Sequence, residues 1–222
     1  MHINSYLVKQ LKLSHQQIKS DIALGYVLID DKIAFQKQAI SANHTVQYKD
    51  QVIQIGKPLF YYAYNKPVGV ESTLNLNIPN NLIQATNIKD YFFPIGRLDK
   101  ASEGLMILTN DGKLYKQITG VASTIEKIYN VAVDKALNED FIKKMAEGIE
   151  IMGVKTKPCK VVLIDTHSFQ ITLLEGRNRQ IRRMCYKLGY AALVLKRIAI
   201  GHLNLGDLQL GKTKPISIAS II

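Results

Sequence analysis

One stretch of the chain constrains the fold more than any other: residues 93–112 read FPIGRLDKASEGLMILTNDG. The stretch places one aspartate, Asp99, between an arginine-bearing turn and an apolar run that is typical of a buried strand. An isolated buried charge is costly, so this carboxylate must cap a turn, pair with a cation or take part in chemistry. Whatever the fold is, it brings a buried strand and a charged group to the same place.

The length and composition describe an ordinary globular chain. Its 222 residues, of which 47% are hydrophobic, are enough for one large or two modest domains. No run approaches the about 18 apolar residues of a membrane span, and the first residues lack the pattern of a signal peptide, so we expect a cytoplasmic protein that binds no membrane. Cys159 and Cys185 form no CxxC pair and no cluster with histidines. We therefore expect neither a metal site nor a disulfide.

The charge calls for a polyanionic partner. The formal net charge is +11, and nucleic acid is the commonest partner of such a protein. Residues 1–56 hold six lysines against four aspartates, a balance of +2, so residues 57–222 carry the remaining +9. Within them, residues 155–197 hold ten basic side chains and two acidic ones. A solvated face kept for solubility is the alternative reading, but such faces usually alternate in sign.

The first 56 residues are predicted to form a small helical unit followed by short strands. Apolar residues recur at helical spacing near the start, and Ser14 is placed to cap a second helix that ends at Gly25. A hairpin with Asp30 and Asp31 at its turn follows, and then another strand. A linker around residues 56–58 connects this unit to the strand expected at 59–65, so we place a domain boundary between residues 56 and 57.

Residues 57–222 alternate strands with helices and predict an α+β domain, with a largely antiparallel mixed sheet flanked by helices. The expected strands are 59–65, 105–109, 127–134, 150–165 and 168–175. The expected helices are 113–118, 138–147 and 179–188. The segment IAIGHLNLGDLQLGKTKPIS, which begins at residue 198, is punctuated by glycines and predicts irregular structure with short edge strands.

The predicted helix 179–188 has two distinct faces. One is apolar and should pack in the core; its residues are Ile181, Met184, Cys185 and Leu188. The neighbouring face carries Arg179, Arg182 and Arg183, and Arg177 stands in the turn before the helix. Cations at a helix start oppose the usual preference for acids there. The arrangement is best tolerated where a phosphate or a carboxylate neutralises it.

Four motifs occur in order: NKPVGVEST (65–73), FPIGRLDKASEGLMILTNDG (93–112), EKIYNV (126–131) and GRNRQIRRM (176–184). Together they resemble the motifs of the RsuA-type family of ribosomal RNA pseudouridine synthases, and most closely those of its large-subunit RluF-type branch. The resemblance covers almost all of residues 59–203. Residues 1–56 similarly resemble the S4 RNA-binding domain that these enzymes carry. The two resemblances together imply an S4-like domain at 1–56 and a catalytic domain at 57–222.

The resemblance also implies a chemistry. Enzymes of this family isomerise uridine within RNA: they break the glycosidic bond at N1 and rejoin the ring through C5, without cofactor or metal. By resemblance Asp99 is the essential carboxylate, and attack on C1′, attack on C6 and proton removal from C2′ all stay open as its role. Arg182 matches the basic residue that we expect to pair with Asp99. Tyr129 matches the tyrosine that stacks on the uracil and is a candidate to assist proton removal from C5.

A uracil stacked in folded RNA must be extruded to reach such a site, at a cost of roughly a few kcal/mol. Phosphate contacts would offset this cost. The candidates for these RNA contacts are Arg97, Lys66, Arg177, Arg179, Arg183 and Lys187. We expect RNA as partner, no DNA, and a monomeric protein.

The leading hypothesis is a pseudouridine synthase acting on structured ribosomal RNA, most of all 23S rRNA. One alternative keeps the chemistry and changes the target to a tRNA anticodon arm. Another is an RNA-binding ribosome-assembly factor without catalysis. Charge and domain order fit this last reading equally well, but a pure binder has no need of a carboxylate in a cationic cleft. The sequence leaves the modified uridine open.

Overall fold

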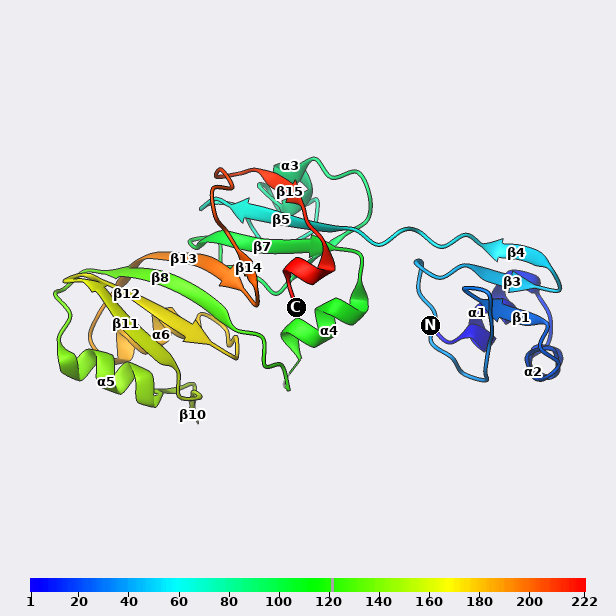
Figure 1. Cartoon of the computed structure of the whole chain (residues 1–222), viewed down its shortest axis with the longest axis horizontal. Helices are drawn as coiled ribbons and strands as arrows, with labels where there is room; N and C mark the ends of the chain where they lie inside the picture. Colours follow the sequence, from blue (N-terminus) through cyan, green and yellow to red (C-terminus); the bar gives the residue numbers. More distant parts are fainter. Residues whose placement is uncertain (121) are drawn as a thin grey trace. The chain divides into compact units, whose positions relative to one another are not determined.

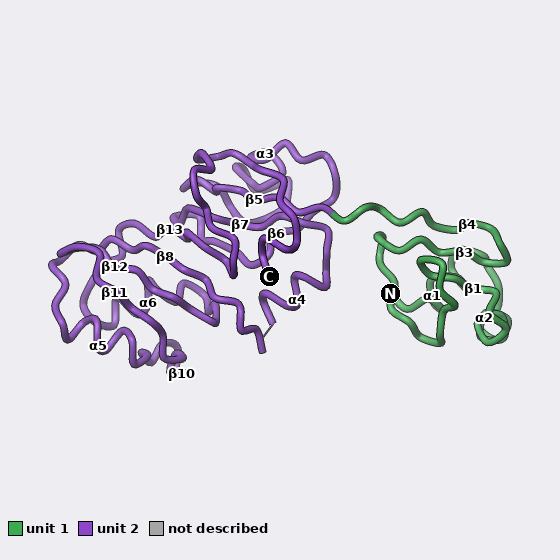
Figure 2. Tube along the Cα trace, in the orientation of Figure 1, with its two compact units in different colours: residues 1–59 green, residues 60–222 purple. Residues whose placement is uncertain are grey.

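A computed structural model describes residues 1–120 and 122–222 of the chain. These residues form two compact units, Met1–Leu59 (unit 1) and Phe60–Ile222 (unit 2) (Figure 2). The division falls three residues beyond the boundary that we placed between residues 56 and 57. No helix in the described part of the chain is long and apolar enough to cross a membrane.

Unit 1 packs two helices on a small antiparallel sheet with strand order β2-β1-β3-β4. Its elements are α1 (Ile3–Leu11), α2 (His15–Ala23), β1 (Val27–Ile29), β2 (Lys32–Ile33), β3 (Val46–Tyr48) and β4 (Gln51–Gln54). Ser14 caps α2 as predicted, because its hydroxyl accepts a hydrogen bond from the Gln17 amide at 3.1 Å. Asp30 and Asp31 form the predicted hairpin turn, and both have positive φ, as a tight two-residue turn requires.

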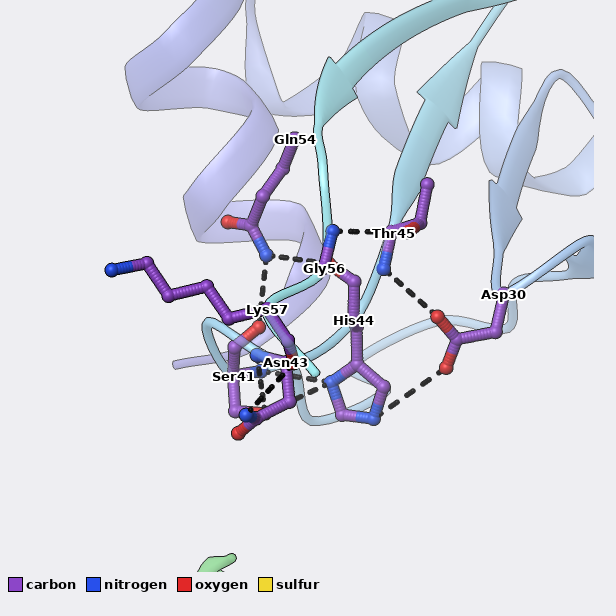
Figure 3. Close-up of polar contacts among 8 residues, drawn as sticks. All are labelled: Asp30, Ser41, Asn43, His44, Thr45, Gln54, Gly56 and Lys57. Atoms are coloured by element: carbon purple, nitrogen blue, oxygen red, sulfur yellow. Dashed lines mark hydrogen bonds and ion pairs between the residues drawn. The ribbon is translucent and has the colours of Figure 1, made fainter. Parts of the chain in front are cut away.

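The loop between β2 and β3 is held by a polar network in unit 1 (Figure 3). The Ser41 amide donates to His44 Nδ1 at 3.0 Å, so the ring proton of a neutral His44 lies on Nε2, which faces Asp30 Oδ2 at 4.0 Å. The other oxygen of Asp30 accepts from the Thr45 amide at 2.8 Å, and the Thr45 hydroxyl accepts from the Gly56 amide at 3.0 Å. This loop therefore derives its order from side chains that bond to the backbone.

Unit 2 is built on one mixed sheet with strand order β11-β12-β8-β13-β7-β5-β15, to which β6 and β14 add at β7 and β13. Every pairing in this sheet is antiparallel except the one between β13 and β7, which confirms the largely antiparallel mixed sheet. Its strands are β5 (Tyr61–Lys66), β6 (Phe93–Ile95), β7 (Glu103–Thr109), β8 (Lys127–Val133), β11 (Lys160–Asp165), β12 (Ser168–Leu173), β13 (Ala192–Ile200), β14 (Leu203–Asn204) and β15 (Thr213–Pro215). A separate hairpin joins β9 (Glu150–Ile151) to β10 (Val154–Lys155).

The helices of unit 2 are α3 (Leu82–Thr86), α4 (Gly112–Thr119), α5 (Glu139–Glu147), α6 (Gln180–Lys187) and the short 3₁₀ turn η1 (Ile218–Ser220). Helix α5 lies beside β11 (Figure 1), and α6 contacts β13 and the β9 hairpin strand. The apolar face predicted for the last helix is buried there: Met184 and Cys185 are 0% exposed and share a core cluster with Phe141 of α5 and Phe169 of β12. Burial of this face fixes the orientation of the arginine-bearing face beside it.

Unit 2 differs from the sequence expectations in several elements. The strand expected at 150–165 is divided into β9, β10 and β11, because the chain turns at Met152–Gly153 and passes through Pro158. Helix α3 and the strands β6 and β13 were not expected, and we had assigned the residues of β13 after 197 to irregular structure. Helix α6 begins one residue late, because Arg179 has a left-handed backbone (φ 50°).

Candidate active site

Asp99 lies in the loop that joins β6 to β7 and is partly buried. Both sides of this loop are anchored. The Leu98 carbonyl accepts from the Ser72 hydroxyl at 2.6 Å, and the Asp99 carbonyl accepts from the Ser102 amide at 2.9 Å. Immediately after the loop, Gly104 has φ +105°, and a Cβ at this position would overlap the backbone of Arg197 on β13. The close approach of these two backbones therefore requires glycine.

The side chain of Asp99 borders a cavity of about 810 Å³, which is within the size range of small-molecule sites. Tyr129 and Arg182 border the same cavity, although they come from β8 and α6. The three residues that sequence reasoning singled out for chemistry are thus brought to one place. Further basic residues of the wall are Arg97, Lys127, Lys157, Arg177, Arg179 and Arg197.

Tyr129 faces the cavity because of the alternation along β8. Lys127, Tyr129 and Val131 are buried, while the residues between them are less so. The ring of Tyr129 is 8% exposed, and the guanidinium carbon of Arg197 lies 6.0 Å from its centroid. The tyrosine therefore presents a fixed aromatic surface in a cationic environment.

Arg182 has other partners than the one that we predicted. Its Nη1 donates to the Ala192 carbonyl at 2.5 Å and its Nη2 to the Ala101 carbonyl at 2.7 Å, whereas no ion pair among the described residues joins it to Asp99. The planar guanidinium can bridge these two carbonyls, and so ties the Asp99 loop to the start of β13. Burial and Arg179 lower the pKa of Arg182, and the negative charge of Asp99 opposes this shift. The coupling between Arg182 and Asp99 is electrostatic, without direct contact.

The prediction for Lys66 as an RNA contact was wrong. Its side chain is 0% exposed, and its ammonium donates to the carbonyls of Pro67 (2.9 Å) and Val70 (2.8 Å). Burial lowers the pKa of Lys66 to about 8, against the raising effect of Glu71 and Asp99. The lysine therefore holds the turn after β5 and cannot reach an RNA phosphate.

The other predicted RNA contacts lie on the surface around the cavity. Arg97, Arg177 and Arg179 are exposed and border it. Arg177 is held by Glu175, with 3.2 Å between Nε and Oε2. Arg183 and Lys187 belong to α6 but lie outside the cavity wall, and Arg183 bonds to Asn178.

Sequence reasoning missed three basic residues of the wall, Arg197, Lys127 and Lys157. Arg197 is 2% exposed, its Nε donates to the Leu105 carbonyl at 2.6 Å, and its buried Nη2 has no partner among the described residues. Burial and the charge of Arg197 lower the pKa of Lys127. A signal was available for Arg197 and Lys127: each stands two positions from a buried apolar or aromatic residue of the same strand, and so on the inward face.

Comparisons with known proteins agree on one family. Residues 60–187, more than half of the chain, match the RNA pseudouridylate synthase family. The chain is 36% identical over 219 residues to the dual-specificity RNA pseudouridine synthase RluF of Escherichia coli strain K12, covering 98% of this chain and 76% of that protein. It is 28% identical over 213 residues to the ribosomal large subunit pseudouridine synthase B of Bacillus subtilis strain 168, covering 92% and 87% of the two chains.

The structure is similar to a crystal structure of a pseudouridylate synthase, with a TM-score of 0.70 and 28% sequence identity over 100% of this chain and 98% of that one. Sequence and structure thus lead to the same assignment. The chain belongs to the RNA pseudouridylate synthase family and is an RNA pseudouridine synthase.

Proposed function

We propose that the chain converts uridine to pseudouridine in 23S ribosomal RNA, with Asp99 as its essential carboxylate. One observation carries the assignment of the site: Asp99, Tyr129 and Arg182, predicted from three separate motifs, border a single cavity. The choice of 23S rRNA is supported by the relative in Bacillus subtilis, whose name assigns it to the large ribosomal subunit. The enzyme family also removes the reason to retain a purely RNA-binding assembly factor.

The cavity defines how the substrate enters. Asp99 and Tyr129 are partly or wholly buried, so a uridine in folded RNA must leave its stack to reach them. Tyr129 then stacks on the uracil, and Asp99 acts on the ribose or the base as an ionised carboxylate. Arg182 and Lys66 both interact electrostatically with Asp99, whose negative charge opposes the lowering of their pKa by burial.

The surroundings of the cavity bind the RNA backbone. Arg97, Arg177 and Arg179 are exposed on its wall, where a flipped nucleotide carries its phosphates. We assign Arg183 and Lys187 to more distant phosphates, because they lie outside the wall on the same helix. In this proposal unit 1 is an S4-like RNA-binding domain and the protein acts as a monomer in the cytoplasm.

The test is to map pseudouridines in total RNA from cells with and without the gene. One or more pseudouridines of 23S rRNA should disappear on deletion, return with the wild-type gene, and stay absent with Asp99→Asn. Purified protein should form pseudouridine in rRNA from the deletion strain, and the asparagine variant should bind this RNA about as tightly while forming none. Retained activity in Asp99→Asn would overturn the assignment of the carboxylate.

The map must also cover tRNA. The relative in Escherichia coli is named a dual-specificity enzyme, which favours examining a second class of RNA. Loss of a pseudouridine from a tRNA anticodon arm alone, with 23S rRNA unchanged, would transfer the proposal to tRNA.

A further inference from the structure

We propose that Arg197 binds the flipped base itself: its free Nη2 donates a hydrogen bond to a carbonyl oxygen of the uracil. This inference rests on the proposed function and adds a base-binding residue to it. The starting point is the unpartnered Nη2, since a buried guanidinium nitrogen without an acceptor is costly and rare in folded proteins.

The position of Arg197 is fixed from several sides. Its backbone lies beside Gly104 of β7 and Tyr129 of β8 in the sheet register. Its Nε is tied to the Leu105 carbonyl at 2.6 Å, and its Nη1 lies 4.0 Å from the place that a Cβ at Gly96 would occupy. The guanidinium is therefore held in one orientation at the cavity wall, beside the ring of Tyr129.

No residue that the structure describes supplies an acceptor for Nη2. Asp99 borders the same cavity, yet no hydrogen bond or ion pair joins it to Arg197 in the described part of the chain, and no other carboxylate pairs with this guanidinium there. Arg182, by contrast, uses both of its terminal nitrogens on backbone carbonyls. Of the two guanidiniums that are not exposed on the wall, Arg197 is the one with a terminal donor to offer.

Burial decides which part of the RNA supplies the acceptor. Arg197 is 2% exposed, whereas Arg177 and Arg179 are exposed at the wall and suit phosphates. A phosphate brought to the depth of Arg197 would lose most of its hydration. A flipped uracil enters as a flat, neutral group and offers carbonyl oxygens at its edge, beside the aromatic ring that Tyr129 presents.

The contact would strengthen during the reaction. When the N1–C1′ bond breaks, its electron pair stays on the base, where the negative charge spreads to O2 and O4. The base then gives a pair from C5 to C1′, C5 loses its proton and N1 gains one, so no oxidant or reductant is needed. A guanidinium hydrogen bond to a carbonyl oxygen favours the charged base over the neutral uridine, which lowers the barrier to detachment.

The test is a cycle of two changes, Arg197→Gln in the protein and removal of the target base in the RNA. The probe is the 23S fragment that carries the mapped uridine, made once with this uridine and once with an abasic ribose there. Arg197→Gln should weaken binding of the uridine RNA about tenfold or more, but binding of the abasic RNA less than about twofold. Arg183→Gln, on a residue outside the cavity wall, should weaken binding of both RNAs by the same factor.

Equal losses for both RNAs with Arg197→Gln would overturn the proposal, because the arginine would then act through the fold or through Asp99. If the glutamine variant does not fold, Arg197→Lys replaces it: its ammonium keeps the charge, so a base contact predicts a smaller but still base-dependent loss. Failure of the proposed function is recognised separately, since the wild-type protein would then form no pseudouridine in the uridine RNA.

Discussion

In unit 1 the carboxylate of Asp21 is 1% exposed and accepts hydrogen bonds from the Tyr48 hydroxyl (2.7 Å) and the Gln17 amide (3.0 Å), with Lys49 at 3.8 Å. In unit 2 the guanidinium of Arg197 is nearly as buried, yet one of its terminal nitrogens has no partner. The described residues contain five buried polar side-chain atoms without a hydrogen bond, and all five belong to unit 2: Tyr64 Oη, Asn65 Oδ1, Ser102 Oγ, Arg182 Nε and Arg197 Nη2.

Three of these five residues, Ser102, Arg182 and Arg197, border the cavity. A buried polar group with all its partners stabilises the fold, whereas one without a partner has a donor or acceptor available for a substrate. Hydrogen bonds, and not burial, therefore distinguish Asp21 from Arg197, because both side chains are almost fully buried. Substitutions in the two units should therefore affect different measurements.

Arg182→Ala is expected to have the largest effect, a fall in turnover of about a thousandfold. The substitution removes a positive charge that interacts electrostatically with Asp99, and the bridge between the carbonyls of Ala101 and Ala192. The rate of pseudouridine formation at saturating enzyme measures it. Arg183→Ala, one residue further along α6 and outside the wall, is the matched control and should weaken RNA binding while leaving the saturated rate nearly unchanged. An Arg182→Ala enzyme that binds poorly but turns over normally would remove Arg182 from the catalytic machinery.

Asp21→Leu should destabilise unit 1 by about 2 kcal/mol, because it removes the buried acceptor of the Tyr48 hydroxyl and the Gln17 side-chain amide and leaves the half-buried hydroxyl without this partner. Hydrogen exchange on the full chain measures this as faster exchange of amides in residues 1–59, with those of residues 60–222 unchanged. Lys49→Gln is the control: the lysine side chain is 49% exposed, so losing its ion pair should cost under about 1 kcal/mol. Similar effects of the two substitutions would show that hydrogen bonds to Asp21 do not carry the stability of unit 1.

Lys66 lies in unit 2 like Arg197, but its buried ammonium is hydrogen-bonded, like Asp21, in this case to two carbonyls. Its burial leads us to expect that stability depends on pH. Its pKa is about 8 in the folded protein and 10.5 ordinarily, so between these pH values the unfolded chain binds more protons than the folded one. Stability must then rise with pH from about 8 to about 10.5, by up to about 3 kcal/mol from this group. Lys66→Met should lack this rise when unfolding in urea is compared across the window. Parallel curves for the two proteins would show that Lys66 stays charged when buried.

Much of this arrangement could be predicted because it depends on local pattern. The cap at Ser14, the turn at Asp30 and Asp31, and the apolar face of α6 follow from spacing and side-chain chemistry within a few residues. The meeting of Asp99, Tyr129 and Arg182 in one cavity was expected from the resemblance of their motifs. Periodicity alone gave no reason to bring the three together.

The misses have a common cause in long-range pairing. β13 is a central strand because β8 and β7 pair with it on both sides, and residues far along the chain supply those pairings. Lys66 resembles an exposed lysine before a proline, but the backbone carbonyls that bind its ammonium become available only when the turn closes over it. Which carbonyl or carboxylate an arginine meets is decided by the same closure, and so Arg182 bonds to Ala101 and Ala192 in place of Asp99.

The smallest effect is expected for the exposed Arg177, and the salt dependence of RNA binding should distinguish it from the buried Arg197. Arg177→Gln should weaken RNA binding only a few-fold, partly because Glu175 already neutralises this arginine in the free protein. It should lower the slope of log affinity against log salt by about one, since one phosphate contact is lost. Arg197→Gln should leave this slope unchanged while lowering the affinity more, because a base contact releases no counterions. A slope that falls equally in both variants would place Arg197 on a phosphate. Its Nη2 would then bind the RNA backbone and not the base.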